Sequence, residues 1–378
     1  MNKTETIPSV TEDVGDELPA GGGWRRRLSF QNISAIYLFI VVFAIFSILV
    51  PGTFLTPGTW LGIFDAESLT VMAAIAVMIP LVAGVFNLAI GAEIAWAVMF
   101  VSVMQASWDV PFWLAIPITL ACGALIGLLS GLIITRLKID SFIATLGMSS
   151  VLLAAKWFIS DNRQITGLDE GFREVARAGW VLAYNSQGNP TFKITLPVMV
   201  MIGVALIVWY VLERIPVGRR MYAIGYNAEG ARLSGVKVER LQIGTLMAGG
   251  VIAALAGVLM ASKLNSGDPT VGPSMLLPAL TAVFLGSTQF KGGRFNVWGT
   301  VLALYVLAVG IKGLQLLGAS GWVEDLFYGV ALLGAVALSR WELTARRLGA
   351  VKRATTFRRR KSDGAEDAAE SASSSSEG

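Results

Sequence analysis

Few side chains in this chain of 378 residues could carry out chemistry. Histidine is absent, and Cys122, the single cysteine, lies within an apolar run. These absences exclude disulfides, zinc sites made of Cys and His, Ser-His-Asp triads and acid–base catalysis by histidine. We therefore expect no catalytic residue, no metal site and no cofactor.

One polar interruption divides the apolar sequence, at Phe86-Asn87-Leu-Ala-Ile-Gly91-Ala-Glu93. Pro80 is expected to kink the helix before it. Inside a membrane, a broken helix is tolerated only where protein buries it or water fills a cavity. A glutamate at that depth costs about 2–3 kcal/mol or more, so it is a candidate functional residue. Glu93 is expected either to face a solute pathway or to lie at the membrane interface.

A second pattern lies in the polar stretch 213–240. Asn227 is a good helix N-cap, Glu229 complements the positive start of a helix, and Gly235 is a good C-terminal stop. About two turns of helix fit between Asn227 and Gly235, with small residues for close approach. Such a helix has no core of its own, so it must lie on the membrane surface, on neighbouring spans or in the groove of a partner.

These residues are embedded in a sequence that is 54% hydrophobic and 15% charged, with a mean hydropathy of +0.64. Soluble domains contain roughly 45–50% apolar and about 25% charged residues. The excess of apolar residues cannot fit inside one water-soluble core. The composition therefore predicts an integral membrane protein.

Ten apolar runs approach the roughly 20 residues that a helix needs to cross a bilayer. The runs are 33–50, 69–86, 88–107, 111–135, 141–160, 194–212, 241–262, 274–289, 295–317 and 322–339. They are continuous rather than alternating, which indicates helices and not the strands of a barrel. The predicted fold class is an all-α integral membrane protein with about ten transmembrane helices. Its boundaries are least sharp near 86–92, 274–289 and 318–321.

The basic residues orient these spans. With ten spans and a cytoplasmic N-terminus, 23 of the 30 Lys and Arg residues fall on the cytoplasmic side and six on the other, with Lys312 inside a span. This asymmetry agrees with the positive-inside rule, so both termini are predicted to be cytoplasmic.

The predicted transmembrane permease domain covers 33–340, between disordered cytoplasmic tails at 1–32 and 341–378. The basic stretch 340–361 is expected to contact anionic lipid rather than nucleic acid. The extracytoplasmic loop 161–193 is expected to form a small lid or docking surface.

Glycines recur at helical spacing in the fourth run. Gly123, Gly127 and Gly131 form two overlapping G-x-x-x-G steps. We expect them to allow another helix to pack closely, rather than to bind solute.

The loop also resembles a known family. The stretch Gly218-Arg-Arg-Met-Tyr222-Ala-Ile-Gly225-Tyr-Asn227 and its continuation to Gly235 are similar to the pattern R-x-x-Y-A-I-G-x-N-x-x-A-A-x-x-S-G-I. That pattern belongs to the cytoplasmic coupling segment of permease subunits of ATP-binding-cassette importers, of the ribose/xylose/galactose-type monosaccharide group.

Three further motifs carry the resemblance across roughly residues 70–340. Ser141-Phe-Ile-Ala-Thr145-Leu-Gly147-Met resembles P-F-I-x-T-L-G-x-M, and the stretch from Ala282 to Thr300 resembles A-x-x-x-G-G-T-S-x-x-G-G-x-G-x-x-x-G-T. Val85-Phe-Asn87-Leu-Ala-Ile-Gly91 lies where the family has G-I-D-L-S-V-G, with Asn87 in place of the aspartate.

The resemblance implies the function and partners. The chain is expected to be the multi-pass cell-membrane permease of an ATP-driven monosaccharide importer. Its expected partners are an extracytoplasmic solute-binding protein, a second permease subunit in a homodimer, membrane lipid and a separate cassette ATPase. The ATPase must be separate because the sequence has no G-x-x-x-x-G-K-[ST] phosphate loop.

The resemblance also assigns residues. Those expected to couple to the ATPase are Tyr222, Gly225, Asn227, Ala228, Glu229, Ala231, Arg232, Ser234 and Gly235. Those expected in the substrate pathway are Phe86, Asn87, Gly91, Glu93, Thr145 and Gly286.

Two alternatives remain at this level. One is a permease of the same class for a nucleoside or a branched-chain amino acid. The other is a secondary transporter driven by protons or sodium, which needs carboxylates at substrate depth, where Glu93 is the serious candidate.

Overall fold

The computed structural model of the chain describes residues 34–161, 163–184, 190–289 and 293–337. The predicted tails at 1–32 and 341–378, including the basic stretch 340–361, lie outside these residues. The described part is mostly helical, in agreement with the predicted class. The exception is one antiparallel hairpin, β1 (Gly179–Tyr184) paired with β2 (Pro190–Thr195), in the predicted lid loop.

The helices follow one another with short connections. They are α2 (Ser34–Leu49), α3 (Pro51–Phe54), α4 (Pro57–Val82), α5 (Ile90–Ala106), α6 (Phe112–Arg136), α7 (Ser141–Ser160), α8 (Glu170–Arg177), α9 (Leu196–Arg214), α10 (Pro216–Tyr226), α11 (Ala228–Leu233), α12 (Val238–Leu264), the 3₁₀ turn η2 (Pro273–Met275), α13 (Leu276–Gln289) and α14 (Val297–Leu316). A last helix is described over 322–337.

Each of the ten predicted runs overlaps one of these helices. Among the described residues, six helices are long and apolar enough to cross a membrane: α4, α6, α7, α9, α12 and α14. The predicted run 69–86 begins too late, since α4 starts at Pro57. Asp65 and Glu67 interrupt the apolar run, but α4 continues through both, and Asp65 forms an ion pair with Lys263.

The bundle packs around α12 and the second half of α4. Helix α12 contacts α4, α5 and α6, and α4 is buried almost continuously from Ser68 to Val82. The predicted glycine steps of α6 are confirmed as a packing face. A Cβ atom at Gly127 would lie 2.3 Å from the Leu246 carbonyl oxygen of α12, and one at Gly123 would lie 2.6 Å from that of Gly250.

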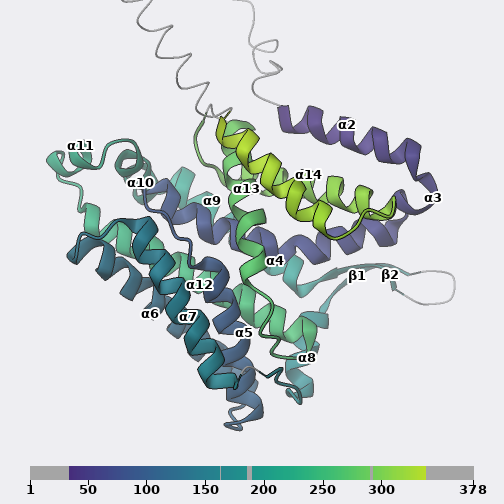
Figure 1. Cartoon of the computed structure of the whole chain (residues 1–378), viewed down its shortest axis with the longest axis horizontal. Coiled ribbons are helices and arrows are strands. Elements are labelled where there is room, and N and C mark those ends of the chain that lie inside the picture. Colours follow the sequence, from purple (N-terminus) through teal and green to yellow (C-terminus); the bar gives the residue numbers. More distant parts are fainter. Residues whose placement is uncertain (1–33, 162, 185–189, 290–292, 338–378) are drawn as a thin grey trace, which may run out of the picture.

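The two ends of the bundle differ (Figure 1). Helices α10 and α11 lie together at one end, which we call the coupling end. Helix α8 and the β1–β2 hairpin lie at the other, which we call the hairpin end. The site residues predicted from the sequence are divided between the coupling end, the non-helical segment 83–89 with the neighbouring parts of α5 and α7, and α13.

Candidate coupling and translocation site

Helix α11 has the predicted cap, short helix and stop. The Asn227 side chain accepts a hydrogen bond from the Gly230 amide at 2.9 Å, and Gly235 has a φ of +82° after the helix ends. Glu229 and Arg232 form an exposed ion pair at 2.7 Å. The hydrogen bond from Arg232 lowers the pKa of Glu229 and raises that of the arginine. Ala231 is buried, so this exposed helix has one face on the protein.

Helix α10 precedes α11 and turns inward, which the sequence did not predict. Tyr222 is buried, and its hydroxyl donates a hydrogen bond of 2.7 Å to the Phe295 carbonyl oxygen. The Arg294 guanidinium lies 3.5 Å from the centre of the Tyr222 ring. Burial raises the pKa of Tyr222 to about 12. Tyr222 therefore connects α10 to the segment that leads into α14.

Gly225 makes a close backbone contact between α10 and the end of α4. A Cβ atom at this position would lie 2.3 Å from the Val82 carbonyl oxygen, at the end of α4. Gly84, with a φ of +75°, also contacts Gly225: a Cβ atom at Gly84 would lie 3.4 Å from the Gly225 Cα atom. Helix α10 thus rests directly on the backbone where α4 gives way to the non-helical segment 83–89. Of the nine predicted coupling residues, Tyr222 and Gly225 are the two that make these inward contacts.

Two exposed residues of the coupling end were missed by the sequence reasoning. Tyr226 is 76% exposed and Leu233 is 80% exposed, although both side chains are large and apolar. Tyr226 ends α10 and Leu233 ends α11, and the predicted coupling residues between them, Asn227, Glu229 and Arg232, are exposed as well. An apolar residue gives no sign of exposure in an apolar sequence, and the resemblance carries no requirement at either position.

The segment 83–89 is the predicted helix break, and hydrogen bonds from buried polar groups hold it in place. Asn87 and Glu93 are each 1% exposed, and the Asn87 amide donates to Glu93 Oε1 at 3.2 Å. Helix α7 supplies acceptors for the free backbone, because Ser141 Oγ accepts from the Phe86 amide and Thr145 Oγ1 from the Leu88 amide, each at 3.2 Å. Buried backbone amides require such partners. Glu93 is therefore buried inside the protein.

A second non-helical segment, 265–275, lies opposite the first part of α5. Gly272 has a φ of +106°, and a Cβ atom there would lie 2.6 Å from the Gly91 carbonyl oxygen and from the Ala95 amide nitrogen. The buried Lys156 of α7 donates a hydrogen bond of 2.6 Å to the Pro269 carbonyl oxygen. Gly91, predicted in the pathway, is thus a packing partner of this segment.

The structure gathers five of the six predicted pathway residues and separates one. Phe86, Asn87, Gly91, Glu93 and Thr145 lie at or beside the segment 83–89, and Phe86 is the exposed member at 39%. Gly286 lies on α13 and packs against α14, where its Cβ atom would be 2.5 Å from the Gly299 carbonyl carbon. The Asn296 side chain caps α14 beside this contact and donates to the Gly286 carbonyl oxygen at 3.4 Å.

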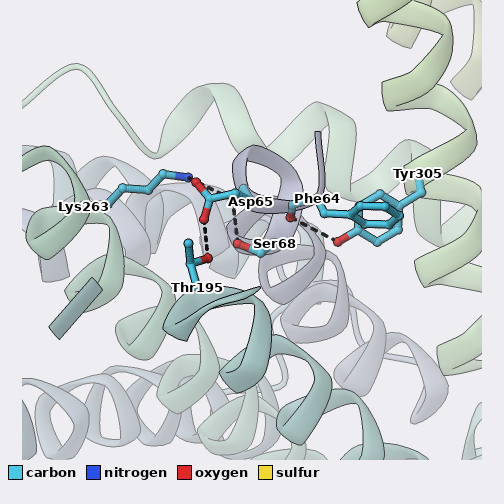
Figure 2. A network of polar contacts seen from close by, with 6 residues as sticks. All are labelled: Phe64, Asp65, Ser68, Thr195, Lys263 and Tyr305. Carbon is cyan, nitrogen blue, oxygen red and sulfur yellow. Dashed lines mark hydrogen bonds and ion pairs between the residues drawn. The ribbon is translucent and has the colours of Figure 1, made fainter. Parts of the chain in front are cut away.

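At the hairpin end, a polar network joins helices that are distant in sequence (Figure 2). Lys263 of α12 lies 2.8 Å from the Asp65 carboxylate of α4 and donates to the Asp65 carbonyl oxygen at 2.9 Å. The Thr195 hydroxyl donates to the same carboxylate, and Tyr305 of α14 donates to the Phe64 carbonyl oxygen at 3.4 Å. The sequence reasoning missed this network, since its partners are brought together only by folding.

Comparisons with known proteins identify the family of this chain. The profile of the family described as "Branched-chain amino acid transport system / permease component" matches residues 59–336. The chain belongs to this permease family. It is 35% identical over 323 residues to the ribose import permease protein RbsC of Bacillus subtilis, covering 84% of this chain and 96% of that protein.

The names of two further relatives refer to other sugars. The fructose import permease protein FrcC of Rhizobium meliloti is 30% identical over 315 residues, covering 82% of this chain and 85% of that protein. The L-arabinose transport system permease protein AraH of Escherichia coli is 29% identical over 330 residues, covering 86% and 97%. No solved structure matches the chain.

Proposed function

We propose that this chain is the membrane-spanning permease subunit of an ATP-driven importer for a monosaccharide. It has no covalent chemistry of its own, and ATP hydrolysis takes place on a separate cassette ATPase. The observation that carries the proposal is the exposed, capped helix α11, joined to α10, whose Gly225 rests on the end of α4. The names of the relatives support a sugar as solute.

The proposed coupling route begins at α11. The exposed Tyr226, Leu233 and Arg232 are the contacts for the ATPase, because exposed aromatic, apolar and arginine side chains are the usual anchors of protein interfaces. Movement of the ATPase reaches α10 and passes through Gly225 to residues 83–89. Such coupling requires two states of this segment that the contact favours differently.

The proposed pathway residues have two different roles, according to whether their side chains are exposed or buried. Phe86, the exposed member, lines the pathway. Asn87, Glu93 and Thr145 are buried and hold the backbone that presents it. Gly91 and Gly286 fix the packing of the neighbouring segments. One oxygen of Glu93 accepts a hydrogen bond from Asn87, whereas its buried Oε2 has no hydrogen-bond partner among the described residues, so Glu93 is the residue to mutate if uptake runs on an ion gradient.

We propose ten spans with both termini in the cytoplasm, so the coupling end is cytoplasmic and the hairpin end is extracytoplasmic. The extracytoplasmic binding protein docks at the hairpin end. A cavity of about 350 Å³ there is lined by Arg177, Lys193 and Lys263, beside the exposed part of α8. A second copy of the chain completes the pathway, since one subunit exposes only Phe86 of the gathered residues.

The test of coupling is co-purification from the native membrane. The full-length chain should carry a cassette ATPase, and Arg232→Glu should lose it because two acidic residues then repel each other on α11. Lys138→Glu is the matched control, since it makes the same charge change at an exposed site of the coupling end away from α11. Retention of the ATPase by Arg232→Glu would contradict the proposed contact.

The test of solute uses the purified assembly in vesicles. Uptake of ribose, fructose and arabinose is compared when ATP is present and when an ion gradient is the only energy source. ATP-dependent uptake of one sugar is the expected result. Uptake of leucine instead would favour the amino-acid alternative that the family description names. Uptake on a proton or sodium gradient without ATP would refute the ATP-driven class.

A further inference from the structure

A basic cavity lies at the coupling end, between α10 and the start of α12. Its volume is about 390 Å³, and it is lined by Arg220 of α10, by Ser234 and Gly235 after α11, and by Lys237, Arg240 and Leu241 at the start of α12. The three cations are exposed. Among the described residues, none of the ion pairs involves Arg220, Lys237 or Arg240.

The backbone adds to the positive potential of this cavity. Helix α12 has 27 residues, and its N-cap residue Lys237 makes no side-chain capping hydrogen bond. The first amides of a helix and its dipole favour an anion at this end. The neighbouring Glu239 does not line the cavity, and its charge acts on Arg232. The cavity thus combines three cations with a helix N-terminus and no lining carboxylate.

An open apolar stripe continues from the cavity along α12. Arg240, Gly244 and Ala248 follow at intervals of four residues, so they share one face of the helix, and all three are exposed. Nothing lies within 4 Å of a Cβ atom placed at Gly244. The other faces of α12 are covered, because Gly127 of α6 lies against Leu246 and the carbonyl oxygen of Ala76 in α4 lies against Gly249.

We infer that this cavity and stripe bind one anionic phospholipid. The phosphate occupies the cavity, and an acyl chain lies along Gly244 and Ala248. Charge complementarity and depth support this occupant: the cations lie just before Leu241, where the apolar run of α12 begins, and cations at that depth attract anionic headgroups. The site is separate from the basic stretch 340–361.

The bound lipid would affect coupling by fixing the positions of helices at the coupling end. Ser234 and Gly235, which line the cavity, immediately follow α11, and Arg220 belongs to α10. A headgroup that bridges Arg220 to Lys237 and Arg240 therefore fixes the helix pair of the coupling end relative to α12.

The test measures lipid binding to the full-length chain by native mass spectrometry. Delipidated protein is titrated with phosphatidylglycerol and, separately, with phosphatidylcholine. In the triple variant Arg220→Gln/Lys237→Gln/Arg240→Gln, the first phosphatidylglycerol should bind about 100-fold more weakly, at about a fivefold loss for each cation. Binding of phosphatidylcholine should not change.

The control variant is Arg136→Gln/Lys138→Gln/Arg219→Gln. It removes the same charge from exposed sites at the same end but outside the cavity. Its first phosphatidylglycerol should keep the wild-type affinity. Equal losses in both triple variants would overturn the inference, because they would indicate diffuse attraction to a basic surface.

A second variant separates a lipid from a free anion. Gly244→Leu places a branched side chain on the stripe and leaves all three cations in place, so it should weaken phosphatidylglycerol binding while the melting temperature stays at or above that of the wild type. If Gly244→Leu has no effect and millimolar inorganic phosphate displaces the lipid, the cavity binds phosphate alone and the inference fails. Release of the lipid from wild-type protein on addition of its ATPase would also overturn it, because an acidic group of the ATPase would then be the occupant.

Discussion

The two non-helical segments inside the bundle are held in different ways. Residues 83–89 contact α10 through glycine backbone, with Gly84 against Gly225, and hydroxyls of α7 accept hydrogen bonds from the amides of Phe86 and Leu88. Residues 265–275 are held by the Lys156 ammonium and by the fit of Gly272 against α5. The first segment is in contact with the coupling end, whereas the main neighbours of η2 in the second, among the described residues, are α5 and α13. On the coupling route that we propose, 83–89 receives the movement of α10 and 265–275 serves as a fixed support.

The largest effect should come from breaking the fixed support. In Gly272→Ala, the new Cβ atom meets the backbone of Gly91 and Ala95, and the φ of +106° is strained for any L side chain. We expect the free energy of unfolding to fall by about 3 kcal/mol or more, since steric overlap and backbone strain add. Thermal melting in detergent measures it. Gly147→Ala is the matched control, because nothing lies within 4 Å of its Cβ position.

Breaking the contact between Gly225 of α10 and Val82 of α4 should affect transport more than stability. In Gly225→Ala, the methyl group meets the Val82 carbonyl oxygen and moves α10 away from α4. We expect a loss of about 1–3 kcal/mol in stability. ATP hydrolysis by the assembly should continue while uptake falls at least tenfold. An assembly that keeps both activities would show that α10 does not act through this contact.

Removing one acceptor of α7 should have a moderate effect. Thr145→Val keeps the shape of the side chain but leaves the Leu88 amide without its partner. Hydrogen bonds between helices in membranes contribute about 0.6–2 kcal/mol, so a destabilisation of about 1 kcal/mol is expected. Thr145→Ser should restore the wild-type melting temperature, because it retains the hydroxyl. If the valine and serine variants melted at the same temperature, the Thr145 hydroxyl would not contribute to stability.

The smallest effect should come from the exposed ion pair of α11. The pKa of Glu229 is lowered by Arg232, so the pair stabilises α11 above the usual pKa of glutamate and the stabilisation is lost as pH falls through the lowered pKa. Glu229→Gln should change ATPase affinity less than about twofold at pH 7, since exposed pairs contribute little. It should also flatten the dependence of that affinity on pH below 5. A large loss at pH 7 would indicate that Glu229 itself contacts the ATPase.

The local features of the site were predictable. The cap at Asn227 and the stop at Gly235 depend on neighbouring residues alone, and both were predicted where they occur. The glycine steps of α6 were also predicted as packing positions. The extent of α4 was not predicted, because Asp65 and Glu67 interrupt the apolar run, and Lys263, the partner of Asp65, lies 198 residues away in the sequence.

The sequence by itself determined the class of protein, the helical runs and the capped helix α11, because composition, periodicity and capping act over short distances. The family came from the resemblance of its motifs. Only the tertiary structure decided that Asn87 and Glu93 bond to each other, that Thr145 satisfies the Leu88 amide, and that Gly225 meets Val82. Each of these depends on which helix faces lie together. In a sequence that is apolar nearly throughout, hydrophobicity does not distinguish a face that meets lipid from one that meets protein.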